Sequence, residues 1–112
     1  MLDAFIASVP KVELHLHLVG SASPHTVSRL AAAHPDVGVP ADPEALDAFF
    51  TFRDFLHFVE VYSAVNSLVL TSADIAEVIE GATRDLAPQG VPYVEMTVTP
   101  YMHTVISTYG TP

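Results

Sequence analysis

The sequence predicts an α/β fold in which two parallel strands are joined by a run of helices. Apolar and polar residues alternate in two short segments, 11–19 near the start and 91–99 near the end, as is typical of strands. Between these segments, apolar residues recur at helical spacing, and each such stretch is preceded by a residue that commonly caps helices. A strand, a helical crossover and a second strand form the unit of a parallel sheet, so we expect a right-handed crossover.

The first predicted strand covers residues 11–19. Its two faces would carry Val12, Leu14, Leu16 and Leu18 on one side and Glu13, His15, His17 and Val19 on the other. Gly20 and Ser21 end the strand. Ser23 followed by Pro24 is typical of a helix N-cap and first turn, so the next segment is predicted to be a helix running toward Ala33.

Two further helices are predicted after a proline-rich loop at 36–43. Asp42 would cap a short helix, and Thr51 with Asp54 resembles a capping box that opens a longer helix at Phe52. The longer helix has an apolar stripe made of Phe52, Phe55, Leu56, Val59, Tyr62 and Val65. Such a stripe is usually core, although an aromatic helix beside a strand-end site could instead wall a pocket for a flat base.

The last long helix is predicted from Thr71 or Ser72 to about 88–90, and the second strand follows at 91–99. That strand would carry Val94, Met96 and Val98 on one face and Tyr93, Glu95, Thr97 and Thr99 on the other. The segment from Tyr101 to Pro112 would then lead into the next helix. Two strands do not close a parallel sheet, and a (β/α)₈ barrel needs about 250 residues. Residues 1–112 are therefore expected to be the incomplete N-terminal part of one barrel domain.

Composition narrows the classes of function. Thirteen acidic against four basic residues give a formal charge of -9, which disfavours nucleic acid and anionic lipid as partners. Cysteine is absent, which excludes disulfides, thiolate zinc sites and cysteine nucleophiles. No signal peptide or clean apolar run of 18 residues is present. We expect a soluble cytoplasmic protein that acts on a small molecule; its oligomeric state stays open.

His15 and His17 are the candidate metal ligands. Residues two apart on a strand project to the same side, about 6.6 Å apart along it, and this pair lies at the carboxyl end of its strand, where α/β sheets place their sites. Imidazole nitrogen suits zinc. The spacing alone leaves two interpretations open, a metal pair or two histidines packed in a sheet or exposed at its edge.

The other polar residues give weaker evidence of a functional site. Glu13 and Glu95 are placed on the same faces as the histidine pair and Thr97, where structural hydrogen bonding is the favoured role. The remaining histidines are interpreted as surface or packing residues: His25, His34, His57 and His103. The sequence contains no glycine-rich phosphate loop and no nucleophile elbow. Attack by a metal-activated water is the reaction type that these residues could serve.

Three motifs together resemble one known family. The run K-V-E-L-H-L-H-L-V-G-S at 11–21 resembles the first-strand motif of adenosine deaminase-like enzymes, in the amidohydrolase group. The run Y-V-E-M-T-V-T-P at 93–100 resembles that family's second strand, and F-R-D-F-L-H-F at 52–58 resembles the helical segment bordering its purine pocket. The resemblance spans nearly the whole chain but only about the first third of a family member.

The resemblance implies a (β/α)₈ barrel with one zinc ion per site, bound in part by His15 and His17. A water on the metal would attack the carbon that bears the 6-amino group of an adenine nucleoside and release ammonia. The family's further zinc-binding histidine, glutamate proton donor, second histidine and aspartate come from later strands. No catalytic residue is therefore expected in this chain, and the general acid is expected beyond Pro112. The resemblance also makes substrate-binding candidates of His17, Val19, Gly20, Phe52, Phe55 and Leu56.

The valine at position 19 indicates which nucleoside is the substrate. Adenosine deaminases usually carry an aspartate at this position, which receives the ribose 5′-hydroxyl, and valine cannot accept that hydrogen bond. The run V-G-S-A-S-P at 19–24, with Thr97 where an arginine is usual, resembles the branch that deaminates aminodeoxyfutalosine. That compound is an adenine nucleoside extended at its 5′ carbon, an intermediate in a bacterial route to menaquinone.

Three alternatives remain at this point. In the first, the substrate is adenosine or adenine instead of the extended nucleoside. The 112 residues alone would be a catalytically inactive fragment, since two histidines leave zinc short of ligands. Alternatively, the chain would be an unrelated α/β module in which His15 and His17 are incidental.

Overall fold

The computed structural model describes residues 1–109, with side chains described through residue 104. Along the chain the elements are α1 (Leu2–Ser8), β1 (Val12–His17), α2 (Pro24–Ala33), η1 (Pro35–Val37), α3 (Pro43–Phe49), α4 (Phe55–Asn66), α5 (Ser72–Leu86), η2 (Ala87–Gln89), β2 (Tyr93–Thr97) and α6 (Pro100–Tyr109). The two η elements are single turns of 3₁₀ helix.

The end of the predicted C-terminal segment, residues 110–112 with Pro112, lies outside the described residues. The general acid expected beyond Pro112 likewise lies outside them, so its placement stays a prediction.

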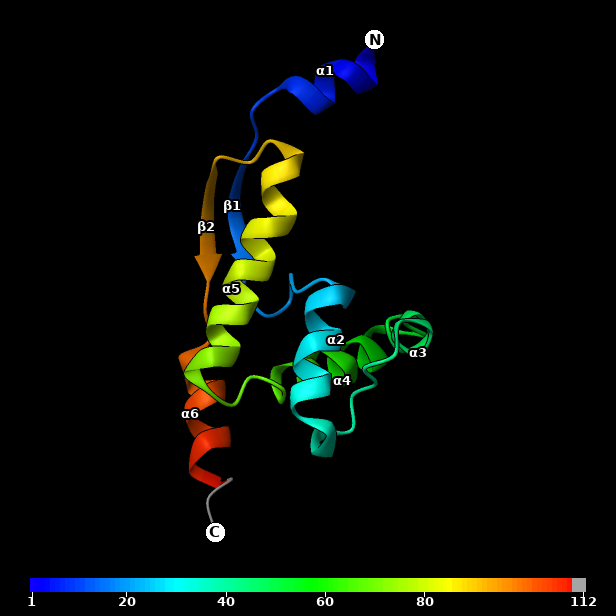
Figure 1. Ribbon diagram of the computed structural model, residues 1–112, viewed down its shortest axis with the longest axis vertical. Helices are drawn as coiled ribbons and strands as arrows, with labels where there is room; N and C mark the ends of the chain where they lie inside the picture. The colour runs from blue at the N-terminus through cyan, green and yellow to red at the C-terminus, as the bar shows by residue number, and fades with distance from the viewer. Residues whose placement is uncertain (110–112) are drawn as a thin grey trace.

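The two strands run parallel and side by side, as the sequence predicts. Helix α5 crosses one face of this pair, while α2, α3 and α4 gather beyond the carboxyl end of β1 (Figure 1). The described part of the chain places no helix on the opposite face of the strands. The predicted α/β class, with two parallel strands joined by helices, is confirmed.

A register shift interrupts β1. Val12 pairs with Tyr93 and Glu13 pairs with Val94, but Leu16 then pairs with Met96, so two residues of β1 lie opposite one of β2. Because paired residues share a face, Glu13 and Leu16 lie on the same side, and both line one hollow against α5. The strict alternation predicted for residues 11–19, which put Glu13 beside the histidines, is therefore wrong.

Three predicted helix starts are confirmed by their caps. Ser23 accepts a hydrogen bond from the Thr26 amide at the start of α2, and Asp42 accepts one from the Ala45 amide at the start of α3. Helix α5 begins behind Thr71, whose side chain forms a reciprocal capping box with Asp74. These bonds satisfy amides that the helix itself leaves unpaired.

Helix α4 begins three residues later than predicted. Asp54 is its N-cap, and its carboxylate accepts a 2.8 Å hydrogen bond from the His57 amide. Thr51 instead donates its hydroxyl to the Asp47 carbonyl at the end of α3. The predicted Thr51–Asp54 capping box is therefore wrong, because the aspartate itself occupies the cap position in an extended backbone conformation.

The core lies between α2, α5 and the segments that follow β1 and α4. Its members are Leu18, Val19, Val27, Leu30, Ala31, Val39, Leu46, Val65, Leu68, Val69 and Val78. Helix α4 contributes Val61 and Val65 as buried residues, whereas Phe55 is 79% exposed and Leu56 is 67% exposed. The interpretation of the predicted apolar stripe as core is wrong for these two residues, for Phe52 and for Val59.

Helices also form at both ends of the described chain. Helix α1, which the sequence pattern does not predict, buries none of its residues and projects away from the strands (Figure 1). Helix α6 begins at Pro100, so the segment that was expected to lead into the next helix is itself helical from its first residue, Tyr101. Among the described helices, none combines the length and apolar character that a membrane crossing needs.

Candidate metal and purine site

The two candidate metal ligands converge at the carboxyl end of β1. The Nε2 atoms of His15 and His17 lie 3.1 Å apart, with ring centroids 5.0 Å apart, and both side chains are exposed. His17 pairs with Thr97 across the two strands. The next residue, Leu18, donates its amide hydrogen to the Thr97 carbonyl at 3.0 Å. The end of β1 is thus fixed to β2 at the point where the histidines project.

Tyr93 and Glu95 lie on β2 at alternate positions and therefore share a face. The Tyr93 hydroxyl donates a 2.7 Å hydrogen bond to the Glu95 carboxylate, and this bond, with a smaller contribution from burial, raises the pKa of Tyr93. Glu95 thus acts as a hydrogen-bond acceptor within its own strand, the kind of role expected for it.

The histidine pair has a spacing that suits one zinc ion. Two ligands at about 2.0–2.1 Å from a tetrahedral zinc lie about 3.3 Å from each other, close to the 3.1 Å observed between the Nε2 atoms. Both imidazole nitrogens are of the donor type that zinc prefers. Within the described residues, no group of three or more histidine, aspartate or glutamate side chains gathers into a complete metal site. The described residues therefore offer two candidate ligands, His15 and His17.

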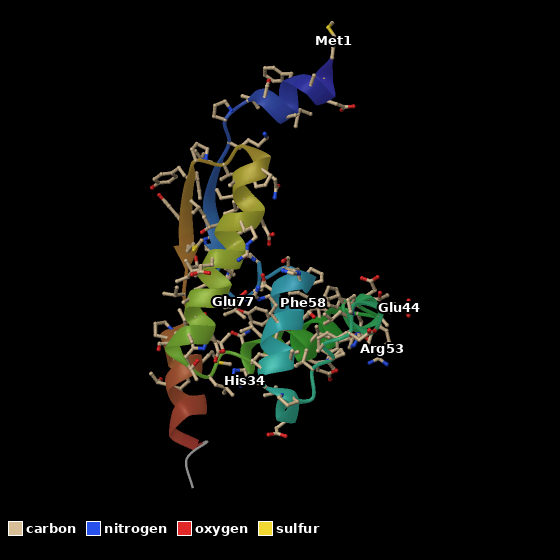
Figure 2. All side chains as sticks on the ribbon, in the orientation of Figure 1. Met1, His34, Glu44, Arg53, Phe58 and Glu77 are labelled. Carbon is tan, nitrogen blue, oxygen red and sulfur yellow. The ribbon has the colours of Figure 1, made fainter. Side chains whose placement is uncertain are left out.

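A cavity of about 470 Å³ adjoins His17, a volume typical of small-molecule sites. It is lined by Leu16, His17, Gly20, Ser21, Phe58 and Tyr62. The turn after β1 forms one wall, held by a 2.9 Å hydrogen bond from the Ser21 amide to the His17 carbonyl. Helix α4 contributes Phe58, which is labelled in Figure 2, and Tyr62 to the lining.

Gly20 lets these two walls approach closely. A Cβ atom on this residue would lie 3.2 Å from Tyr62 Cε2 and 3.3 Å from His17 Cβ, tighter than ordinary van der Waals contact. Any side chain at position 20 would therefore press on both the metal-ligand candidate and the aromatic wall.

A second hollow of about 280 Å³ lies next to the first and shares Gly20, Phe58 and Tyr62 with it. Its full lining is Val19, Gly20, Ala22, Pro24, Phe50, Phe52, Phe58, Val61, Tyr62 and Val65. Val19 is buried and belongs to the core, so it presents a fixed apolar surface here. Among the described residues, no charged side chain lines this hollow.

The structure brings four of the six predicted substrate-binding residues to these cavities: His17, Val19, Gly20 and Phe52. Phe55 and Leu56 line neither cavity and project outward from the first turn of α4. Sequence reasoning missed Phe58 and Tyr62, which line both cavities. Their four-residue spacing places both on one face of α4, but this helix is apolar on most of its surface, so the spacing alone does not show which face lines a cavity.

His34 lies outside both cavities and pairs with a carboxylate of another helix. Its Nε2 atom, at the end of α2 (Figure 2), lies 2.9 Å from Asp74 Oδ1 at the start of α5. Burial acts to raise the pKa of Asp74, but hydrogen bonds from His34, Thr71 and the Leu70 amide together lower it below its usual value. This pair joins two helices that pack on each other, in keeping with the packing role expected for His34.

The sequence matches known deaminases over nearly its full length. The family model for adenosine deaminase matches residues 10–108. An aminodeoxyfutalosine deaminase of Streptomyces avermitilis is 53% identical over 103 residues, covering 92% of this chain and 29% of that protein. The enzyme of the same name from Streptomyces coelicolor is also 53% identical over 103 residues, covering 92% of this chain and 27% of that protein.

A comparison with solved structures also finds a deaminase. The crystal structure of an adenine deaminase from Arthrobacter aurescens superposes with a TM-score of 0.73 at 28% identity, covering 92% of this chain and 31% of that one. The chain thus spans less than a third of the length of these relatives, and its two strands and their helices correspond to part of an amidohydrolase (β/α)₈ barrel. With a matching family model over 10–108 and these relatives, the chain belongs to the adenosine deaminase family.

Proposed function

We propose that the full-length protein hydrolyses the 6-amino group of an adenine nucleoside extended at its 5′ carbon, with aminodeoxyfutalosine of menaquinone biosynthesis as the preferred substrate. The observation that carries this proposal is the 53% identity to two aminodeoxyfutalosine deaminases over 103 residues. The acidic balance of the chain, 13 against 4, supports a small-molecule substrate in place of nucleic acid or a membrane surface.

His15 and His17 would hold the metal from the end of β1. Zinc, when bound, supplies hydroxide near neutral pH because it lowers the pKa of water. The 3.1 Å spacing of the two Nε2 atoms supports this assignment. The parallel pairing of His17 with Thr97 would keep the second ligand in place.

The adenine ring would occupy the cavity beside His17. Phe58 and Tyr62 supply aromatic side chains on one wall, with ring centroids 6.2 Å apart, and Gly20 leaves the opposite wall without a side chain. A flat heterocycle gains from such apolar and aromatic surfaces. These residues would orient the base and exclude water from it, while the proton donor and the remaining metal ligands would come from elsewhere in the full-length protein.

Val19 supports the extended nucleoside over adenosine. Its buried, apolar side chain offers no acceptor to a free 5′-hydroxyl, and leaving such a group unpaired in a buried site costs about 1–3 kcal/mol. The runner-up function is deamination of adenine or adenosine, which the structural match to an adenine deaminase favours.

The 112 residues alone would be catalytically inactive. The described residues provide two histidines and no third metal-binding side chain beside them, and zinc in catalytic sites takes three protein ligands.

Steady-state kinetics on the full-length gene product, supplied with zinc, test the proposal. Ammonia release is compared for aminodeoxyfutalosine, adenosine and adenine. We expect kcat/KM to be highest for aminodeoxyfutalosine. The Val19→Asp variant should raise the ratio of adenosine to aminodeoxyfutalosine kcat/KM by about tenfold or more, while Val19→Leu, which stays apolar, should not raise it. Deamination of none of the three compounds would contradict the proposed function.

A further inference from the structure

Of the two glutamates on the paired strands, Glu95 alone shares a face with the histidine pair. His17 pairs with Thr97, and Glu95 lies two residues before Thr97 on the same strand, so all three side chains project to one side. Glu13 lies on the other face, because it pairs with Val94 and lines the hollow against α5. The carboxylate on the face of the candidate metal ligands therefore comes from β2, although the alternation in β1 predicts Glu13 there as well.

The register shift brings Glu95 level with His15. Leu14 and His15 both lie opposite Glu95, where two residues of β1 face one of β2. His15 projects to the same side as His17, and their Nε2 atoms lie 3.1 Å apart. Adjacent strands are about 4.8 Å apart, a gap that a glutamate side chain spans. Glu95 is therefore within reach of the His15 ring.

His15 and Glu95 each have an unused polar atom. The Nε2 atom of His15 faces that of His17, and within the described residues its Nδ1 atom makes no hydrogen bond. The Tyr93 hydroxyl donates to Oε1 of Glu95 at 2.7 Å, which leaves Oε2 without a partner in the part of the chain that the structure describes. The bond from Tyr93 holds the carboxylate in place as an acceptor for a second donor.

A zinc-bound imidazole needs a partner for its second nitrogen. When Nε2 binds the metal, the ring hydrogen is on Nδ1, and metal-binding histidines almost always donate that hydrogen to a carboxylate, a backbone carbonyl or water. Such a bond fixes the orientation of the ring and makes the metal-binding nitrogen more basic. The pairing of the strands places Glu95 where it can accept this hydrogen.

We propose that Glu95 is a positioning residue for the metal site, whose free carboxylate oxygen accepts the Nδ1 hydrogen of His15. The bond directs the Nε2 atom of His15 toward the zinc ion, and Tyr93 holds the carboxylate that makes it. This inference rests on the proposed function, since His15 must be a zinc ligand for its second nitrogen to matter. Glu13 has no part in it.

The zinc affinity of the full-length gene product tests the role of Glu95 without any substrate. The zinc dissociation constant is measured by competition with a chromophoric chelator for wild type, Glu95→Gln and Glu13→Gln. We expect Glu95→Gln to raise the dissociation constant by about tenfold or more, the usual effect of losing the partner of a metal-binding histidine. Glu13→Gln, the same substitution on the other face of the strands, should leave it unchanged.

Tyr93→Phe gives a second test that leaves the carboxylate itself intact. It removes only the hydroxyl that holds Glu95, so the dissociation constant should rise, but by less than in Glu95→Gln. This variant decides the question if Glu95→Gln fails to fold.

Urea unfolding of the metal-free proteins separates positioning from a purely structural role. Glutamine keeps the shape of the side chain and an oxygen acceptor for Tyr93, so Glu95→Gln should leave the unfolding midpoint unchanged while zinc binds more weakly. A lowered midpoint with wild-type zinc affinity would assign Glu95 to the fold alone and overturn the inference.

The remaining outcomes separate the two proposals. Wild-type zinc affinity in both Glu95→Gln and Tyr93→Phe would overturn the inference and leave the proposed deamination intact. An equal loss of affinity in Glu95→Gln and Glu13→Gln would do the same, because the register shift places Glu13 on the opposite face. Failure of the wild-type protein to bind zinc would overturn the proposed function and this inference with it.

Discussion

Replacing Asp74 with alanine is expected to lower the free energy of unfolding by about 3–5 kcal/mol, because it removes the acceptor of a partly buried network. One carboxylate oxygen accepts from the Leu70 amide at 3.0 Å, the Thr71 amide at 2.8 Å and the Thr71 hydroxyl at 2.9 Å. The other oxygen lies 2.9 Å from His34 Nε2. Alanine leaves both amides without this partner and breaks the capping box of α5.

Asp74→Asn separates the two halves of this network. Its single oxygen can keep the bonds to Leu70 and Thr71, while its amide faces His34, so the expected loss is smaller, about 1–2 kcal/mol. Glu80, exposed on the same helix, provides the matched control, and Glu80→Ala should change stability by less than about 0.5 kcal/mol. Urea unfolding of the full-length gene product at neutral pH measures all three variants.

The pH dependence gives a second check on the same carboxylate. Its pKa lies below the ordinary value of 3.8 in the folded state, so its contribution to stability is present above the unfolded pKa and is lost as the pH falls through the folded pKa. The part of the stability advantage of wild type over Asp74→Asn that comes from this carboxylate should shrink as the pH falls below 3.8. A loss under about 1 kcal/mol for Asp74→Ala would refute the reasoning.

Three further stability predictions use the same unfolding assay. Gly81→Ala should destabilise by up to about 2 kcal/mol, because a Cβ there would overlap the Thr26 hydroxyl and lie 3.1 Å from its Cγ2, a clash that costs about 1–3 kcal/mol against a helix-propensity gain of about 1. Thr26→Ala in the same protein should restore the lost stability, and no restoration would contradict the clash. Leu68→Ala should cost about 2–5 kcal/mol because Leu68 is fully buried. Leu70→Ala, at a residue that is 41% exposed, should cost less than Leu68→Ala. Asp54→Ala should lower the free energy of unfolding by about 1 kcal/mol and Thr51→Ala by about half of that or less, because Asp54 is the N-cap of α4 and Thr51 is not. A larger loss for Thr51→Ala than for Asp54→Ala would support the capping box that the sequence predicts.

Local patterns predicted the elements that local interactions determine. Ser23, Asp42 and Thr71 satisfy amides three residues away, so the start of each helix is readable from a few neighbouring residues. Alternation likewise revealed the two strands and placed His15 and His17 near the carboxyl end of the first one. The parallel pairing of the strands then followed from the helical crossover between them.

The register shift in β1 was not predictable in this way. It depends on how Glu13 and Leu16 meet a strand some 80 residues later in the chain, and alternation within a single strand carries no information about its partner. The placement of Glu13 against α5 is a consequence of that pairing.

The orientation of α4 was hidden for a different reason. The helix is apolar on most of its surface, with Phe55, Leu56 and Val59 exposed while Val61 and Val65 are buried. When apolar residues surround a helix, their spacing no longer identifies the buried side, which only the neighbouring elements decide. The roles of Phe58 and Tyr62 as cavity walls emerged for the same reason only from the packed structure.

Pairs formed across the chain were equally out of reach. His34 and Asp74 are 40 residues apart and meet because α2 packs on α5. A histidine at the end of one helix and an aspartate at the start of another are common in sequences, and nothing local marks them as partners.

Metal analysis of the full-length gene product tests the central claim most directly, that β1 provides two zinc ligands of an adenine nucleoside deaminase. After purification in the presence of zinc and removal of free metal, wild type should retain about one zinc per chain. His15→Ala and His17→Ala should each lose most of the zinc together with aminodeoxyfutalosine turnover, whereas His25→Ala, at an exposed position on α2, should keep both. Full zinc retention with normal turnover in the His15 and His17 variants would contradict the account.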